Sequence, residues 1–273
     1  MDGSGLASLI DRALAEDIGS GDLTAQAVVP ADARATGRIV QKAEGVIAGL
    51  EVAEAVFRRV DPDTVFRARL EGDVVAELEG IARSILAAER VALNFLGRLS
   101  GIATLTARYV QAVEGTGAAI LDTRKTTPGL RALEKAAVVA GGGRSHRSGL
   151  YDALLVKENH AMLAGGVGEA TRRALTGAPP GAAVQVESAS LSELEEALDA
   201  GAKSILLDNF APGDLREAVR SARGRATLEA SGGITLDNVR EVAETGVDRI
   251  SVGALTHSAP ALDLSLLLEV QRA

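Results

Sequence analysis

The second half of the chain alternates short apolar segments with amphipathic segments of roughly ten residues. For example, the apolar run ILLD at 205–208 precedes the helix-like DLREAVRSARG at 214–224. Short buried strands that alternate with helices are typical of βαβ units and a parallel sheet. The pattern repeats for six strands, and the glycine-rich GGGRSHR at 141–147 is a candidate for one more. The alternation therefore predicts an α/β domain that closes, or nearly closes, into a barrel.

The first part of the chain follows a different pattern. An amphipathic helix at 6–17 and a second helix at 50–60 are separated by alternating, strand-like sequence. A long helical run at 84–115 then leads into the barrel. We predict an N-terminal α/β domain at 1–102 and a barrel domain at 103–261, with 262–273 packing back on the N-terminal domain.

Composition excludes several classes of protein. The chain has 273 residues, a net charge of −8 and no cysteine, which argues against a nucleic-acid partner, an anionic membrane partner and thiolate chemistry. The N-terminus lacks the basic region and apolar run of a signal peptide, and no segment is long and apolar enough for a membrane span. We expect a cytoplasmic protein. Only 2% of the residues are aromatic, so a ligand would be recognised by charge and hydrogen bonds.

Polar side chains follow every predicted barrel strand. In (β/α) barrels the carboxyl ends of the strands converge and carry the chemistry. A strand must stop somewhere, so a single polar strand end means little, but six on one edge indicate a site. The strand-end residues are Asp122, Thr123, Arg124, Lys125, Lys157, Glu158, Asn159, His160, Glu187, Ser188, Asp208, Asn209, Ser231, Gly232, Gly233, Ser251 and Gly253.

The predicted site has a local positive charge. Between Asp122 and His160 there are seven Lys and Arg residues against four Asp and Glu residues. We expect Arg131 and Lys135 on a helix surface and the other cations on strand ends or loops, where arginine and lysine bind carboxylates and phosphates. SGGI at 231–234 and SVGA at 251–254 follow the last two strands, where barrels usually bind phosphate.

Two carboxylates end neighbouring strands in the same region. Glu187 and Asp208 are suited to Mg²⁺, which prefers carboxylates together with substrate phosphates. A structural pairing with Lys125 or Lys157 is the alternative, and both roles can hold together. We expect His160 to cap the next helix and His257 to be structural.

The motifs around this site resemble those of the quinolinate phosphoribosyltransferase family, also called carboxylating nicotinate-nucleotide pyrophosphorylases. The resemblance covers essentially the whole chain. Its most specific part is ILDTRKTTPGLRALEKAAVVAGGGRSHRSGLYDALLVKENH at 120–160, and EDIGSGDLT, AERVALNFLGRLSGIAT, LLDNF, LEASGGI and ISVGALTHSAPALDLSL support it.

The resemblance implies a fold and a reaction. The fold is an N-terminal α/β sandwich followed by a seven-stranded open (β/α) barrel, in a homodimer with active sites at the interface. The reaction joins quinolinate to phosphoribosyl pyrophosphate with Mg²⁺ and yields nicotinate mononucleotide, pyrophosphate and CO₂ in NAD biosynthesis.

The resemblance also implies residue roles. Arg124, His146 and Arg147 bind the quinolinate carboxylates, with Arg90 of the partner subunit. Lys125 and Lys157 face phosphoribosyl pyrophosphate and the reacting centre, while Glu187 and Asp208 line the ribose and metal region. The 5′-phosphate is held by Ser231, Gly232, Gly233 and Gly253.

The chain departs from the family pattern at three positions. Ser145 stands for the usual Asn, Glu158 for Asp and Gln185 for Glu, which changes neighbouring hydrogen bonds and charge. Three alternative functions remain open. They are a Schiff-base barrel using Lys125 or Lys157, a paralogue of molybdenum transport, in which the lysine at the Lys157 position is typically replaced, and a non-catalytic phosphate-binding barrel.

Overall fold

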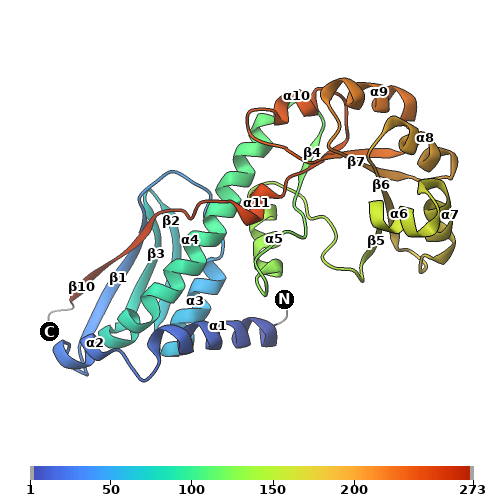
Figure 1. Ribbon diagram of the computed structural model, residues 1–273. Coiled ribbons are helices and arrows are strands. Elements are labelled where there is room, and N and C mark those ends of the chain that lie inside the picture. The colour runs from blue at the N-terminus through green and yellow to red at the C-terminus, as the bar shows by residue number, and fades with distance from the viewer. Residues whose placement is uncertain (1–2, 271–273) are drawn as a thin grey trace. The chain divides into compact units, whose positions relative to one another are not determined.

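Two β-sheets, one antiparallel and one parallel, organise the described residues (Figure 1). The computed structural model describes residues 3–270, except for the side chains of residues 70, 71 and 270. These residues cluster into two units. Unit 1 comprises the chain up to Thr104, the segment Ala132–Ala140 and the chain from Ala259. Unit 2 comprises Leu105–Arg131 and Gly141–Ser258.

The sheet of unit 1 is antiparallel and has the strand order β10-β1-β3-β2. Its strands are β1 (Arg34–Gln41), β2 (Val65–Glu71), β3 (Val74–Ile81) and β10 (Leu264–Val270). Strand β10 lies beside β1 although the two are far apart in sequence (Figure 1), and Leu266 is paired with Ile39. The C-terminal segment therefore completes the sheet formed by the N-terminal strands.

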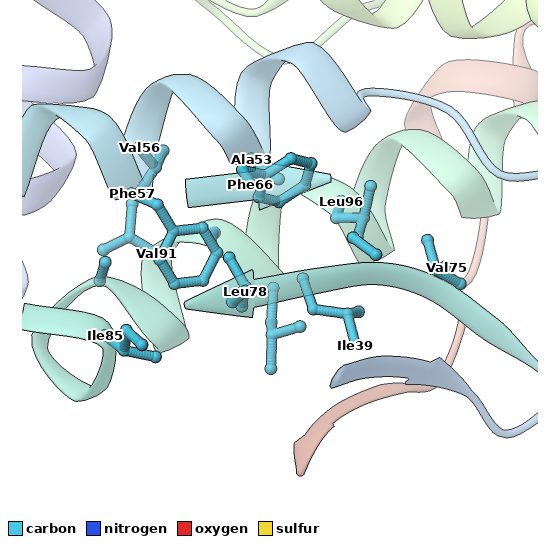
Figure 2. Close-up of a cluster of buried hydrophobic side chains, with 14 of the residues drawn as sticks. Ile39, Ala53, Val56, Phe57, Phe66, Val75, Leu78, Ile85, Val91 and Leu96 are labelled. Atoms are coloured by element: carbon cyan, nitrogen blue, oxygen red, sulfur yellow. The ribbon is translucent and has the colours of Figure 1, made fainter. Parts of the chain in front are cut away.

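Three helices pack their apolar residues against this sheet: α1 (Gly3–Ile18), α3 (Leu50–Val60) and α4 (Ala82–Ala112), which continues into unit 2. The other helices are α2 (Leu23–Val28) and α5 (Arg131–Ala140). In Figure 2, Phe57 from α3 and Val91 from α4 point toward Leu78 on β3. Phe57 and Leu78 are almost completely buried, so each contributes roughly 1.5–3 kcal/mol by burial alone.

Helix α5 is attached to α4 by a buried ion pair. Arg98 donates from Nε and Nη2 to Oε1 of the fully buried Glu134, at 3.2 and 2.9 Å. Lys135 is only 5% exposed. The expectation that Lys135 lies on a helix surface is therefore wrong, because α5 packs against other elements with the face that carries its charged residues.

The sheet of unit 2 is parallel, with the strand order β4-β9-β8-β7-β6-β5. Its strands are β4 (Ala119–Leu121), β5 (Ala153–Val156), β6 (Ala183–Ser188), β7 (Ser204–Asp208), β8 (Thr227–Ser231) and β9 (Arg249–Ser251). The helices between them are α6 (Glu158–Ala164), α7 (Val167–Gly177), α8 (Leu191–Asp199), α9 (Pro212–Ala222) and α10 (Val239–Ala243), and α11 (Ala254–His257) follows β9. The α/β class predicted from the alternation is confirmed.

The glycine-rich segment occupies the seventh strand position without becoming a strand. It contributes one isolated parallel bridge, between Arg144 and Leu121. Gly142 has a φ of +86°, which strand geometry does not accommodate. Beyond Arg144, the backbone N–H of His146 donates to the Asp122 carboxylate, so the backbone leaves the ladder. The barrel is therefore open beside this segment.

None of the helices in the described part of the chain combines the length and the apolar character that crossing a membrane would need.

Candidate active site

A cavity of about 400 Å³ lies at the carboxyl ends of the parallel strands of unit 2, and we call it the strand-end cavity. Because strands of one parallel sheet end at the same edge, residues distant in sequence meet there. Every predicted site residue except Arg90 lines it: Arg124, Lys125, His146, Arg147, Lys157, Glu187, Asp208, Ser231, Gly232, Gly233 and Gly253. The convergence predicted from the strand ends is therefore present.

Asp122 fixes one wall of the cavity from below. Its carboxylate is fully buried at the end of β4 and accepts hydrogen bonds from the backbone N–H of His146 at 2.8 Å and from the Ser145 hydroxyl at 3.2 Å. A buried carboxylate needs such donors, because an unsatisfied charge is costly to bury. The sequence marked Asp122 as a strand end, and the structure adds its role as the anchor of the loop that carries His146 and Arg147.

Arg124 and Arg147 form the most cationic part of the cavity. Burial lowers the pKa of Arg147, and the nearby positive charge of Arg124 lowers it further. Nε of Arg124 is buried without a hydrogen-bond partner among the described residues. Two like charges with an unsatisfied donor are stabilised when an anion binds between them. This part of the cavity is therefore suited to a carboxylate or phosphate ligand.

Arg131 supports both loops that carry these arginines. Its guanidinium donates to the Thr126 hydroxyl at 3.0 Å, to the carbonyl oxygen of Ser148 at 3.0 Å and to that of Arg124 at 3.4 Å. The expectation that Arg131 is a helix-surface residue is therefore wrong. The sequence offered no signal for this role, because the three acceptors come from loops whose positions depend on the tertiary fold.

His146 is linked to Gln185, which the sequence showed only as a departure from the family pattern, and through Gln185 to Glu229, which the sequence analysis did not name. Its Nε2 lies 3.0 Å from Oε1 of Gln185, and the Gln185 amide donates to Glu229 at 2.9 Å. Gln185 and Glu229 are buried inside the barrel. A Glu within the apolar strand sequence TLEAS at 227–231 was the signal available for Glu229.

Lys157 and Glu187 face each other across β5 and β6. Nζ of Lys157 is 3.3 Å from Oε2 of Glu187, and the Lys157 side chain is half exposed. The backbone N–H of Lys157 donates to Nδ1 of His160, which caps α6. The prediction that His160 is a capping residue is confirmed.

Asp208 supplies a second carboxylate to the cavity. It accepts a hydrogen bond from the Asn209 amide at 2.7 Å, and Asn209 has a φ of +59°. Among the described residues, no group of three or more His, Cys, Asp or Glu side chains is arranged to hold a metal ion. Glu187 and Asp208, the carboxylates predicted to bind a metal, both line the strand-end cavity.

The glycines after β8 and β9 let neighbouring side chains lie close to the backbone. Gly232 has a φ of +92°, and a Cβ atom there would lie 2.1 Å from Oδ1 of Asn209. A Cβ at Gly253 would lie 3.2 Å from Cδ of Lys125. Thr256 donates to the carbonyl oxygen of Lys125 at 2.8 Å, which ties the last loop to the first. Such glycine turns allow close backbone approach to phosphate.

His257 and Arg90 differ in their position relative to the strand-end cavity. His257 lines the strand-end cavity beside Gly253, and its Nδ1 lies 2.6 Å from the Ser258 hydroxyl oxygen, so its structural role stays a prediction. Arg90 lies on α4 in unit 1 and is exposed. It is not among the residues that line the cavity, and its predicted role stays a prediction.

The fold and the cavity define a (β/α)-barrel enzyme suited to substrates that carry phosphate and carboxylate groups. The family model described as "Quinolinate phosphoribosyl transferase, N-terminal domain" matches residues 22–100, and that for the C-terminal domain matches residues 102–267. The chain belongs to the quinolinate phosphoribosyltransferase family.

Individual relatives agree with this assignment. The chain is 40% identical to the probable carboxylating nicotinate-nucleotide pyrophosphorylase of Bacillus subtilis, over 96% of this chain and 92% of that protein. It superposes on the crystal structure of NadC from Streptococcus pyogenes with a TM-score of 0.94 and 38% identity, over 100% and 99% of the two chains. The nicotinate-nucleotide pyrophosphorylase of Francisella tularensis gives a TM-score of 0.93 and 40% identity, over 98% of each chain.

Proposed function

We propose that the protein transfers the phosphoribosyl group of phosphoribosyl pyrophosphate to quinolinate, with loss of CO₂. The products are nicotinate mononucleotide and pyrophosphate, and the step belongs to NAD biosynthesis. The observation that carries the proposal is the pairing, in one cavity, of the Arg124 and Arg147 guanidiniums with the glycine turn at Gly232. One feature suits a dicarboxylate and the other a sugar phosphate.

The charges of the cavity support this reaction. The bond between ribose C1 and pyrophosphate breaks, and its electron pair leaves with pyrophosphate, where Lys125 and Lys157 stabilise the negative charge. Glu187 and Asp208 offset positive charge on the ribose. The quinolinate nitrogen forms the new bond to C1 and becomes cationic. The ring then accepts the electron pair released with CO₂, and a proton takes the place of the lost carboxylate. No covalent enzyme intermediate is needed.

Mg²⁺ is the metal that we propose for this site. Glu187 and Asp208 would hold it together with the pyrophosphate oxygens, and when bound it neutralises charge on the leaving group. Chelation of divalent metal should abolish turnover, and added Mg²⁺ should restore it. Full activity in the presence of a chelator would contradict this part of the proposal.

We also propose a homodimer in which Arg90 reaches the partner subunit's quinolinate site. The exposed position of Arg90 on α4 supports this arrangement, because it leaves the guanidinium available to a second chain. A higher oligomer built from such dimers is compatible with it. The cytoplasmic location, the absence of a membrane partner and the absence of a nucleic-acid partner remain predictions from the sequence.

The direct test is to incubate the purified protein with quinolinate, phosphoribosyl pyrophosphate and Mg²⁺. Release of labelled CO₂ from the carboxyl group of quinolinate, with formation of nicotinate mononucleotide, is the expected result. Binding of both substrates without release of pyrophosphate would instead support a non-catalytic phosphate-binding barrel. A Schiff-base mechanism is disfavoured because Lys157 is half exposed and paired with Glu187, unlike a desolvated reactive amine.

A further inference from the structure

A chain of three polar side chains crosses the interior of the barrel at the base of the strand-end cavity, which His146 and Glu229 line. His146 comes from the loop after the isolated bridge, Gln185 from β6 and Glu229 from β8. Gln185 is 7% exposed and Glu229 is 1% exposed. Polar groups buried to this extent are normally retained with their hydrogen bonds satisfied, because each unsatisfied group is costly.

The donors and acceptors of this series of hydrogen bonds give it one direction, from His146 through Gln185 to Glu229. The backbone N–H of Arg147 donates to Nδ1 of His146 at 2.7 Å, so the neutral ring carries its proton on Nε2. Nε2 then donates to Oε1 of Gln185 at 3.0 Å. The amide group of Gln185 donates in turn to Oε2 of Glu229 at 2.9 Å. Each step fixes the orientation of the next group, and the chain ends on a carboxylate.

The His146 ring therefore acts as the second anchor of the Arg147 loop. On one side of the loop, the His146 N–H is held by Asp122. On the other side, the Arg147 N–H is held by the ring, whose own position depends on Gln185. The guanidinium of Arg147 is carried by this backbone and also donates from Nη1 to the carbonyl oxygen of Ala153 at 3.2 Å. Its position in the cavity therefore depends in part on Gln185, although Gln185 does not line that cavity.

The neutral amide of Gln185 lies between the His146 ring and one oxygen, Oε2, of the Glu229 carboxylate. Oε1 of Glu229 lies 3.5 Å from Nε2 of His146 and has no hydrogen-bond partner among the described residues. A carboxylate at position 185 would place two buried negative charges about 3 Å apart, and they could not both remain ionised. An amide at this position orients His146 without adding negative charge beneath a site for an anionic ligand.

We infer that Gln185 is a positioning residue for the carboxylate-binding wall of the cavity, acting through His146 and anchored by Glu229. The inference rests on the proposed function for the identity of the ligand, quinolinate. The effect of Gln185 is confined to the dicarboxylate, since the phosphate-binding turns after β8 and β9 make no hydrogen bond to it within the described chain.

The first test replaces Gln185 with methionine, which has similar volume and cannot form both hydrogen bonds. Calorimetric titration should show quinolinate binding weakened by about tenfold, with phosphoribosyl pyrophosphate binding unchanged. The matched control is Thr171→Val, which removes a buried hydrogen bond from the Thr171 hydroxyl to Val167 on α7, away from the cavity. Equal weakening of both substrates, or no weakening of quinolinate binding, would overturn the inference.

The second test exchanges the two interior groups in the double variant Gln185→Glu, Glu229→Gln. Here the new carboxylate accepts from both His146 and the new amide, so the donor pattern and the net charge are conserved. Quinolinate binding should recover to near the wild-type value. A double variant that binds quinolinate as weakly as Gln185→Met, while unfolding at the wild-type temperature, would contradict the positioning role.

The third test observes the His146 ring directly by NMR of its nitrogens, which is practical because the chain has only three histidines. The wild-type ring should be the Nε2–H tautomer, and Gln185→Met should broaden or shift its signals while those of His160 and His257 stay in place. An Nδ1–H tautomer in the wild type would refute the inferred direction. This readout needs no substrate, so a wild-type protein that shows the tautomer but does not bind quinolinate would sink the proposed function alone.

Discussion

Lys157 and Glu187 form an ion pair across the carboxyl ends of β5 and β6, with 3.3 Å between Nζ and Oε2. The pair is partly open to solvent, since the Lys157 side chain is 50% exposed. Exposed pairs of this kind contribute only about 0–1 kcal/mol to stability. Its position in the strand-end cavity therefore matters for chemistry more than for folding.

Replacing Lys157 with methionine should lower kcat by roughly 10²–10³-fold, because a cation aimed at the leaving pyrophosphate is lost. The melting temperature should stay close to that of the wild type. Steady-state kinetics with both substrates saturating, together with a thermal melt, measure the two effects. Arg172→Met is the matched control, because it breaks an exposed pair with Glu169 on α7 and leaves the cavity unchanged. A kcat for Lys157→Met equal to that of this control would show that Lys157 has no catalytic role.

Arg124→Ala and Arg147→Ala should weaken quinolinate far more than phosphoribosyl pyrophosphate. Each removes a charged donor from the cationic wall, at a cost of about 2–5 kcal/mol in quinolinate binding. Separate titrations of the two substrates test this division. Arg144→Ala serves as control, because Arg144 belongs to the same glycine-rich segment but lines a different cavity, beside α4. Similar losses for both substrates would refute the assigned roles.

Quinolinate should be used in strong preference to nicotinic acid. The cavity presents Arg124, Arg147 and His146. Together they offer more positive charge and more hydrogen-bond donors than a single carboxylate can satisfy. A ligand without the second carboxylate leaves a buried charged donor unpaired, and the ratio of kcat/KM values should reach roughly 10⁴. Arg147→Ala should reduce this ratio. Comparable turnover of the two acids by the wild type would rule out a site built for a dicarboxylate.

Gly232→Ala should selectively impair binding of phosphoribosyl pyrophosphate. The added Cβ would lie 2.1 Å from Oδ1 and 3.0 Å from the backbone nitrogen of Asn209, so the turn after β8 has to shift. Gly181→Ala is the control for backbone strain, which we do not expect to weaken phosphoribosyl pyrophosphate binding by itself. Gly181 also has positive φ, but a Cβ there meets no atom within 4 Å. Unchanged affinity for phosphoribosyl pyrophosphate in Gly232→Ala would exclude this turn from the phosphate site.

The strand ends could be predicted from the sequence because they follow from local rules. Strand and helix periods identify βαβ units, and parallel strands bring their carboxyl ends to one edge. Periodicity alone therefore assigns residues as far apart as Arg124 and Gly253 to one cavity. These local rules do not decide whether the glycine-rich segment at 141–147 forms a strand. Strand formation there depends on the φ of Gly142 and on the Asp122 carboxylate, which competes for the backbone N–H of His146.

The supporting residues could not be predicted in the same way. A charged residue within an apolar strand marked Glu229 as unusual, but its partner Gln185 lies on another strand 44 positions away, so the pairing was not visible in the sequence. Arg131 has the spacing of a surface helix residue, yet its three acceptors lie in loops. Such roles depend on long-range geometry, which local periodicity does not encode.

Arg90 tests the proposal of shared active sites. It is exposed on α4, while neighbouring apolar residues on the same helix, including Val91 and Leu96, are buried and hold the helix against the sheet of unit 1. Burial raises the pKa of the adjacent Glu89, and the Arg90 charge opposes that shift. A surface partner of Glu89 is one role for Arg90. The proposed role is to complete the partner subunit's site, which a closed two-fold interface would do twice.

Mixing two inactive proteins, Arg90→Ala and Lys157→Ala, distinguishes these roles. If sites are shared, a mixed dimer has one site with both defects and one with neither, so each heterodimer should regain about half the activity of a wild-type dimer. The control mixes Lys157→Ala with Asp208→Ala, whose defects lie in the same strand-end cavity. Every site in that mixture keeps one defect, and no activity should return. Mass spectrometry establishes that the subunits have exchanged. An Arg90→Ala mixture that has exchanged and stays as inactive as this control would show that Arg90 does not act across the interface.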